Sequence, residues 1–239
     1  MRRRFFVDEV RNGHAHIEGD AAKHLTNVLR LEVGQKYEIS DNRQAWLAEV
    51  ESARKSDVVF RTLEKLLPEP QRVRVTLCAA LVKFDHFEWM IEKTTELGVA
   101  EIVPVIATRT ERGLDKAAEK RVERWRRIGL EASQQSRRQF LPEIPDAVPF
   151  RTAVQQEAKY RYVLDEVPGG PPLLAALPSA RSAEDSVALL VGPEGGWAAD
   201  ELSRAARHGQ FVSLGARTLR ADEMPLAAVS SLWTIWRGW

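Results

Sequence analysis

The chain is poor in cysteine and has no long apolar run. Its 239 residues include one cysteine, Cys78, which excludes an internal disulfide and leaves too few thiolates for a cysteine zinc site. Cys78 lies in an apolar segment, so we expect it to be a small buried side chain. No apolar window approaches the roughly 20 residues of a membrane-spanning helix. Two acids, Asp8 and Glu9, follow the basic N-terminus too closely for a signal peptide. These absences predict a globular protein of the reducing cytoplasm with no membrane partner.

The common fingerprints of nucleotide-binding and metal enzymes are also missing. No Gly-x-Gly pattern follows an early strand, and neither a Ser-His-Asp elbow nor a His-Glu-x-x-His helix is present. The five histidines show no ligand spacing beyond His14 and His16, which fall in a predicted surface hairpin. The sequence therefore disfavours dehydrogenases, class I methyltransferases, hydrolases and zinc enzymes, and it predicts no metal site.

The formal net charge of +1 is uninformative about partners, but the distribution of charge is not. Residues 109–138 contain ten Lys or Arg against five Asp or Glu, a surplus of five positive charges. A local cationic surface is typical of proteins that bind polyanions. A solvated helix face with charge pairs at i,i+4 spacing explains the same residues equally well.

The first part of the chain, residues 1–67, predicts a small β-barrel with one helix. Short apolar runs separated by turn residues indicate strands near 5–7, 16–18, 36–40, 45–51 and 58–63. One helical pattern spans 20–30, with Asp20 in the place of an N-cap. Two prolines in 67–71 stop both helix and strand, which marks a linker.

The second part, residues 72–239, changes to alternating strands and helices. Apolar strands are predicted at 73–82, 101–106, 160–165, 187–191 and 211–214. Helices are predicted at 85–97, closed by Gly98, at 116–135, and from Asp222 to about Trp236. Apolar strands alternating with helices favour an α/β fold with a mainly parallel sheet covered on both faces.

Two glycine-containing loops follow strands of this second part. The strand at 187–191 runs into Gly-Pro-Glu-Gly-Gly at 192–196, and the strand at 211–214 runs into Gly215 and a segment that ends at Arg220. Glycine lets a ligand approach the main chain, and open α/β sheets bind ligands at the carboxyl ends of strands. The pair of loops therefore predicts one binding site.

The composition of these loops argues against a phosphate ligand. Glu194 would place a negative charge where a phosphate sits, and neither glycine pattern matches a phosphate-binding motif. A neutral or cationic nucleotide-like ligand suits the site better.

Several motifs that follow one another along the chain resemble those of a known family. They are Arg-Phe-Phe-Val at 4–7, His-Leu-Thr-Asn-Val-Leu-Arg at 24–30, Lys-Thr-Thr-Glu-Leu-Gly-Val at 93–99, Glu-Ala-Ser-Gln-Gln-Ser-Arg at 131–137 with Pro142, and the two loops at 192–196 and 214–220. The chain resembles the ribosomal RNA small subunit methyltransferase E family. That family comprises SPOUT-class enzymes that methylate N3 of a uridine in 16S rRNA.

The resemblance implies a fold, a cofactor and partners. It implies a C-terminal parallel sheet with a SPOUT trefoil knot, which the general rule against knots would not suggest, and an N-terminal PUA-like RNA-binding β-barrel. It also implies a homodimer that binds S-adenosylmethionine in the knot and acts on 16S rRNA or the small ribosomal subunit. Carried over by position, the cofactor-binding residues are Leu190, Gly192, Gly196, Leu214, Gly215, Leu219 and Arg220.

Arg220 and Asp222 are the predicted catalytic residues. Uridine N3 carries a proton and is a poor nucleophile, so the site must remove that proton or stabilise the anion. Arg220 is suited to stabilise negative charge on the uracil carbonyls. Asp222 is suited to position Arg220 or to act as the base, and positioning is favoured because an exposed aspartate is a weak base for so weak an acid. Where the family usually shows Arg-x-Glu-Thr-Ala, this chain has a shorter acid at Asp222 and Glu223 in place of the hydroxyl.

The predicted phosphate contacts to RNA are basic residues from both parts of the chain: Arg2, Arg3, Arg4, Lys23, Arg30, Arg109, Arg112, Arg137 and Arg138. Two alternatives to uridine-N3 methylation stay open. One is a SPOUT methyltransferase acting on a ribose 2′-hydroxyl or a tRNA base. The other is a non-catalytic RNA-binding assembly factor, which the altered sequence after Arg220 keeps open.

Overall fold

The computed structural model describes residues 3–70, 72–164 and 170–236. Contacts between Cα atoms divide the chain into two compact units. The first comprises Met1–Pro70 with Ser133–Leu141, and the second comprises Gln71–Ala132 with Pro142–Trp239. Within the described ranges, no helix combines the length and the apolar content that crossing a bilayer requires.

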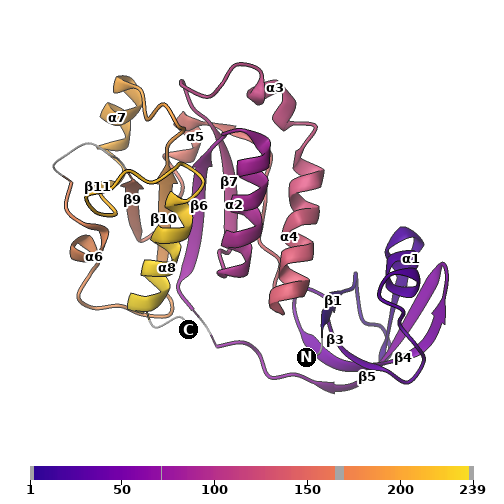
Figure 1. Ribbon diagram of the computed structural model, residues 1–239. Coiled ribbons are helices and arrows are strands. Elements are labelled where there is room, and N and C mark those ends of the chain that lie inside the picture. The colour runs from indigo at the N-terminus through magenta and orange to yellow at the C-terminus, as the bar shows by residue number, and fades with distance from the viewer. Residues whose placement is uncertain (1–2, 71, 165–169, 237–239) are drawn as a thin grey trace. The chain divides into compact units, whose positions relative to one another are not determined.

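The first unit is built on a five-stranded sheet in the order β1-β3-β4-β5-β2 (Figure 1). Its strands are β1 (Arg4–Phe6), β2 (His14–Glu18), β3 (Lys36–Ser40), β4 (Ala45–Arg54) and β5 (Asp57–Lys65). β1 and β3 are parallel and the other pairs are antiparallel. β1 and β2 stand at opposite ends of this order, so the sheet forms a half-barrel rather than a closed barrel.

The core of the first unit forms between this sheet and helix α1 (Gly19–Asn27). Phe5, Ile39 and Phe60 on the strands and Ala22 and Leu25 on α1 are buried together. The predicted helix is confirmed, but the predicted N-cap is wrong.

The cap position of α1 is occupied by Glu18, which makes no side-chain cap hydrogen bond. Asp20 instead lies inside the first turn and accepts a hydrogen bond from Lys23 Nζ at 2.7 Å. A positive φ of 65° at Gly19 turns the chain into the helix one residue earlier than predicted.

Residues 133–141 belong to the first unit because polar contacts tie them to it. Ser40 Oγ donates to the Gln139 carbonyl at 2.7 Å, and the Glu69 amide donates to Gln139 Oε1 at 2.8 Å. The Leu141 amide donates to Asn42 Oδ1 at 2.7 Å. These bonds join residues 70 to 99 positions apart, so the unit is discontinuous in sequence.

The second unit contains a six-stranded, all-parallel sheet in the order β11-β9-β10-β6-β7-β8. Its strands are β6 (Arg74–Ala80), β7 (Glu101–Ile106), β8 (Val148–Pro149), β9 (Tyr160–Leu164), β10 (Ser186–Val191) and β11 (Gln210–Val212). The helices are α2 (Phe84–Glu96), α3 (Leu114–Ala118), α4 (Val122–Ser136), α5 (Phe150–Ala153), α6 (Leu173–Ala176), α7 (Ala199–Ala205) and α8 (Met224–Trp236).

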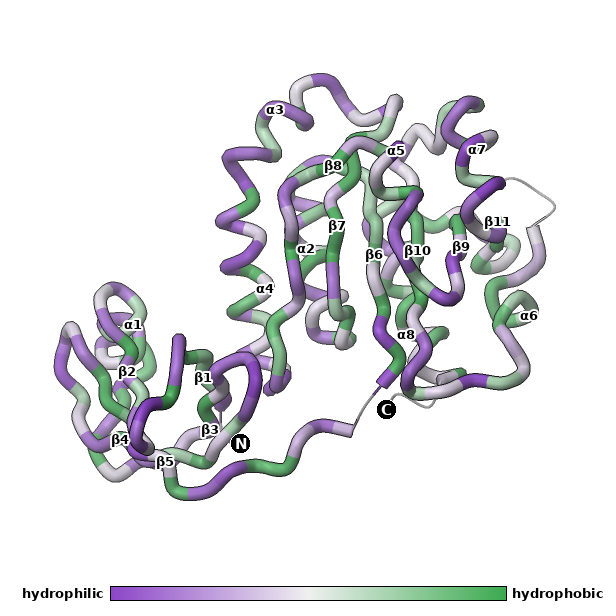
Figure 2. The backbone as a smooth tube through the Cα atoms, turned by 180° about the vertical axis from the view of Figure 1, so that it is seen from behind, coloured by the Kyte–Doolittle hydropathy of each residue, from purple (hydrophilic) through white to green (hydrophobic). Residues whose placement is uncertain are grey.

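Both faces of this sheet are buried, as the apolar strands predict. Alternate residues of β6 and β10, such as Leu77 and Leu189, face the core beneath α2, α4, α6 and α8. The intervening residues, such as Cys78 and Leu190, face the core beneath α5 and α7. Figure 2 shows the resulting apolar centre of the sheet, with polar segments on the outer helices. The prediction of a parallel sheet covered on both faces is confirmed.

The long helix predicted at 116–135 is two helices in the structure, α3 and α4. The break falls at 119–121, where the amides of Lys120 and Arg121 donate to the carbonyls three residues earlier and tighten the turn. Arg121 then pairs with Glu88 at 3.1 Å and lies 4.9 Å from the centre of the Phe84 ring. The spacing of charged residues continues unchanged through residues 119–121, so the sequence pattern did not predict the break.

The predicted stop after α2 is confirmed. Gly98 has φ of 95°, a left-handed conformation that closes the helix at low cost. A side chain here would also meet the Trp233 indole of α8, which lies 3.4 Å from the position of a Cβ. Trp233 is itself buried.

We predict that Cys78 is inert toward thiol reagents in the folded protein. Its side chain is fully buried, and this burial, with a smaller contribution from the Glu101 carboxylate, raises the pKa of the thiol to about 12. The reactive thiolate is therefore scarce at neutral pH. A chromogenic disulfide reagent should label the native protein far more slowly than the urea-unfolded chain. Labelling of native and unfolded protein at equal rates would contradict the prediction.

Candidate functional site

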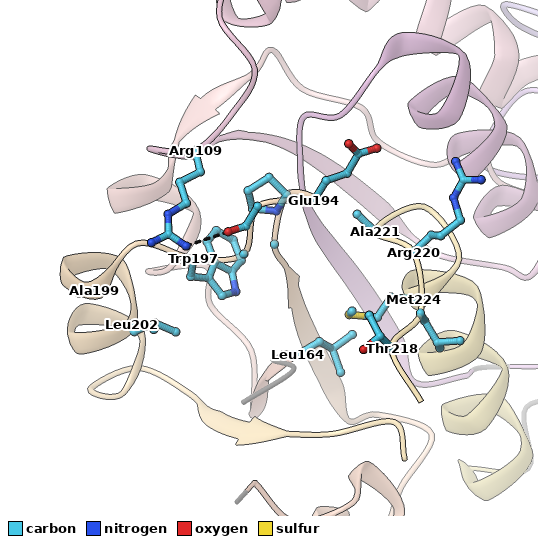
Figure 3. Close-up of a pocket in the computed structure, with 15 residues that line it drawn as sticks. Arg109, Leu164, Glu194, Trp197, Ala199, Leu202, Thr218, Arg220, Ala221 and Met224 are labelled. Atoms are coloured by element: carbon cyan, nitrogen blue, oxygen red, sulfur yellow. Dashed lines mark hydrogen bonds between the residues drawn. The ribbon is translucent and has the colours of Figure 1, made fainter. Parts of the chain in front are cut away.

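A pocket of about 840 Å³ lies at the carboxyl ends of β9 and β10 (Figure 3). Leu164 is the last residue of β9, and Gly192 follows β10 directly. The segment from Thr218 to Met224, between β11 and α8, supplies another wall. The full lining is Arg109, Leu164, Gly192, Pro193, Glu194, Gly195, Gly196, Trp197, Ala199, Leu202, Thr218, Leu219, Arg220, Ala221 and Met224.

The Trp197 indole supports the glycine loop from below. It is buried, packs against Phe150 with ring centroids 4.9 Å apart, and lies against Gly192. A Cβ added at Gly192 would lie 3.1 Å from Trp197 Cε2 and 3.2 Å from Nε1. Trp197 Nε1 is buried without a hydrogen-bond partner in the part of the chain that the structure describes. The pocket is thus lined by one buried donor that nothing in the described structure satisfies.

The far side of the loop is fixed by polar contacts. Arg109 Nη1 donates to the Gly195 carbonyl at 2.8 Å. Glu201, which is buried in α7, accepts hydrogen bonds from the amides of Thr108 at 2.8 Å and Ala198 at 2.9 Å. The Glu201 carboxylate therefore takes the place of a serine cap at the start of α7. Its negative charge also lies near the positive end of the helix dipole, which stabilises the helix.

The predicted catalytic pair lies at the other side of the pocket, where Figure 3 shows Arg220 opposite Arg109. Arg220 Nε lies 3.3 Å from Asp222 Oδ1, and the Asp222 side chain is nearly buried while that of Arg220 is 57% exposed. His86 of α2 joins them: its Nδ1 lies 2.8 Å from Asp222 Oδ2, and Arg220 Nη2 lies 2.8 Å from Nδ1 and 3.1 Å from Nε2. The structure brings the two predicted residues together and adds a third.

Four of the predicted cofactor residues line the pocket: Gly192, Gly196, Leu219 and Arg220. The other three, Leu190, Leu214 and Gly215, are outside the lining. Leu190 lies in β10 and is buried against the α5 and α7 side of the sheet, and Leu214 packs on the opposite core.

Sequence inspection missed His86 and Trp197 as parts of the site. His86 is 134 positions from Arg220 in the chain and belongs to no recognisable motif, so nothing in the sequence linked the two. Trp197 was visible as the residue after the Gly-Gly pair, but its contact with Gly192 depends on how the loop closes.

The predicted RNA-contacting residues fall into two groups. Arg3, Lys23, Arg30, Arg109 and Arg112 are exposed. Arg4, Arg137 and Arg138 are buried or half-buried in the first unit. Arg2 lies outside the described residues.

The buried group is engaged with carboxylates and carbonyls. Arg4 pairs with Glu38 at 3.0 Å and with Glu69 at 3.2 Å, and Arg137 also pairs with Glu38. Arg138 donates to the Phe140 carbonyl. Burial lowers the pKa of the Arg138 guanidinium to about 10, and the Glu69 charge opposes this shift, so the group stays cationic at neutral pH.

Comparisons with known proteins agree with this architecture. The family described as RNA methyltransferase domain matches residues 69–233, and the family described as RNA methyltransferase PUA domain matches residues 17–63. A ribosomal RNA small subunit methyltransferase E of Synechocystis sp. is 35% identical over 87% of this chain and 69% of its own length. The Bacillus subtilis relative of the same name is 31% identical over 90% of this chain and 88% of its own length.

A crystal structure of ribosomal RNA small subunit methyltransferase E from Neisseria gonorrhoeae, bound to S-adenosyl methionine, is similar throughout. It superimposes with a TM-score of 0.87 at 26% identity and covers 99% of this chain and 98% of its own. The parallel sheet, its strand-end pocket and the PUA unit together define an RNA methyltransferase. Within that class, the chain belongs to the ribosomal RNA small subunit methyltransferase E family. The predicted resemblance is confirmed.

We predict that Gly192→Ala destabilises the protein by about 1–3 kcal/mol, because the new methyl group overpacks a rigid contact. The Trp197 indole cannot give way, since it is buried against Phe150. Urea denaturation followed by tryptophan fluorescence measures the loss.

Gly195→Ala is the matched control in the same loop. Its added Cβ would lie 3.6 Å from Arg109, an ordinary contact, so a change within about 0.5 kcal/mol is expected. Equal losses in the two variants would show that the Trp197 contact is not the cause.

Proposed function

We propose that this protein transfers the methyl group of S-adenosylmethionine to N3 of a uridine in 16S rRNA. The observation that carries the proposal is the pocket, which combines the glycine loop at 192–196 with Arg220 on one rim. Family membership supports methyl transfer to small-subunit rRNA. The relative from Neisseria gonorrhoeae, which is bound to S-adenosyl methionine, supports the cofactor.

The residues present fit this cofactor. The buried Trp197 Nε1 is a donor that lacks a partner among the described residues, and glycines at 192 and 196 leave main-chain groups accessible. The exposed Glu194 carboxylate suits a cationic ligand better than a phosphate. When bound, S-adenosylmethionine supplies an electrophilic methyl group on a sulfonium. We propose that Leu190, Leu214 and Gly215, which lie outside the lining, shape the pocket through the strand ends that carry it.

Arg220 is the proposed catalytic residue. Methylation at N3 requires loss of the N3 proton, and negative charge then accumulates on the two neighbouring carbonyl oxygens of uracil. A guanidinium at the pocket rim stabilises that charge through paired N–H donors. Asp222 holds the opposite side of the guanidinium at 3.3 Å and thereby restricts its orientation.

The proposed RNA contacts are the exposed basic residues Arg3, Lys23, Arg30, Arg109 and Arg112. Arg4, Arg137 and Arg138 instead hold the first unit together through Glu38, Glu69 and the Phe140 carbonyl. The trefoil knot and the homodimer are parts of this proposal that rest on the family resemblance, and a cytoplasmic location is a part that rests on the composition of the chain.

We predict that a strain lacking this gene lacks 3-methyluridine in its 16S rRNA, and that the purified protein binds S-adenosylmethionine in calorimetry. Mass spectrometry of rRNA digests measures the first outcome. Loss of a 2′-O-methyl group or of a tRNA modification instead would assign a different SPOUT activity. Absence of measurable cofactor binding would favour a non-catalytic assembly factor and overturn the enzymatic proposal.

A second prediction separates catalysis from binding. Arg220→Ala should lower the rate of methyl transfer by at least about 100-fold, because a donor to the developing anion is lost. Its affinity for S-adenosylmethionine should change by less than about tenfold, equivalent to about 1.4 kcal/mol. Equal losses of binding and transfer would instead assign Arg220 to the cofactor alone.

A further inference from the structure

His86 is the one histidine among the described residues that contacts the predicted catalytic pair. It lies in the first turn of α2, and its side chain is 28% exposed. The Asp222 carboxylate reaches it on one side at 2.8 Å, and Arg220 Nη2 reaches both ring nitrogens within 3.1 Å. A half-buried imidazole thus contacts both members of the predicted catalytic pair, which lie in the segment between β11 and α8.

The hydrogen-bonding capacity of imidazole restricts how this cluster is satisfied. A neutral ring has one N–H donor and one acceptor nitrogen. Ionised Asp222 only accepts, so Nδ1 must donate to it. Nε2 then carries the lone pair, and it is the acceptor available to Arg220, whose guanidinium only donates. The neutral Nδ1–H tautomer therefore satisfies Asp222 and offers Arg220 one acceptor at 3.1 Å, although Nη2 also lies 2.8 Å from the Nδ1 donor.

We infer that His86 is a positioning residue that holds Arg220 in the orientation required for methyl transfer. The inference rests on the proposed function of Arg220. Among the described residues, the Arg220 side chain is otherwise restrained by Asp222 at 3.3 Å, and the exposure of the guanidinium to solvent weakens that ion pair. A second contact from α2 limits the rotation of a long, entropically costly side chain.

The same geometry makes the contact sensitive to pH. A protonated His86 donates from both nitrogens, loses its acceptor for Arg220 and repels the guanidinium. Two carboxylates face the ring in that state: Asp222, and Asp85 of the same helix, whose Oδ2 lies 3.9 Å from Nε2. Acidification therefore releases Arg220 from α2 while keeping His86 in place.

The tautomer is tested first, in the full-length protein without cofactor. Long-range ¹H–¹⁵N correlation spectra of the His86 ring should show the Nδ1–H form near neutral pH. Asp222→Asn should reduce the population of this form, because the carboxylate that selects it is gone. A dominant Nε2–H form in the unaltered protein would overturn the inference, whatever the protein methylates.

Kinetics provide the second test. His86→Ala should lower the turnover number by about 10–100-fold, the scale associated with a displaced catalytic group. Its affinity for S-adenosylmethionine should stay within about threefold of the unaltered protein. His86→Asn offers a donor and an acceptor but does not titrate. It should recover part of the turnover number and flatten the acid limb of its pH profile.

His208→Asn is the matched control, because His208 lies after α7 and, among the described residues, makes no hydrogen bond or ion pair with Arg220 or Asp222. It should leave both the turnover number and the acid limb unchanged. An unaltered turnover number in His86→Ala, or an unaltered acid limb in His86→Asn, would contradict the role. Retained cofactor binding shows that each variant is folded. If the unaltered protein transfers no methyl group, the proposed function fails, while the ring spectra still decide the state of His86.

Discussion

The parallel pairing of β10 with both neighbours is the constraint on which the pocket depends. β10 is aligned with β6 from Ser186 to Val191 and with β9 through Val191 and Leu164. This register brings the end of β9 level with Gly192, so the glycine loop and Leu164 form adjacent walls. A slip of one residue would exchange the two faces of β10 and bury Leu189 on the wrong side. The packing of the two apolar cores therefore determines where the glycine loop and Leu164 lie, independently of the polar residues of the site.

The glycine loop is restrained on several sides, which leaves one face accessible to a ligand. Trp197 fills the space beneath Gly192, and Arg109 holds the Gly195 carbonyl. Glu201 satisfies two amides that would otherwise be unpaired near the start of α7. Such restraints reduce the conformational entropy that binding would have to remove. Trp197 Nε1, buried beside Gly192, has no hydrogen-bond partner among the described residues.

Sequence periodicity predicted most of the second unit because the central strands are buried on both faces and the long helices α2 and α4 are amphipathic. It also located the two loops, since glycine and proline report directly on backbone geometry. It did not predict the break between α3 and α4, which depends on a tight turn within a stretch that is rich in basic and acidic residues throughout. Short elements such as α5, α6 and β8 are set by tertiary packing rather than by their own pattern.

Residues of the candidate site were predicted only where they lie close together in the sequence. Residues within one loop, such as Gly192 and Gly196, are recognised by their neighbours in sequence. His86 and Arg220 meet only because α2 packs beside the chain leading into α8, and no local pattern encodes that contact. Residues 133–141 present the same difficulty in the first unit, where Gln139 contacts segments far away in the chain.

The departure of this chain from its family's pattern gains a physical interpretation from the His86 contact. Asp222 is one methylene shorter than the glutamate usual at this position, yet it lies within reach of both Arg220 and His86. Glu223, in place of the usual hydroxyl, accepts from the Arg220 amide at 3.4 Å. Pro225 fits the first turn of α8, where no amide donor is required. Asp222 contacts Arg220 at Nε, and the imidazole of α2 contacts it at Nη2, so the two restraints act on different nitrogens of the guanidinium.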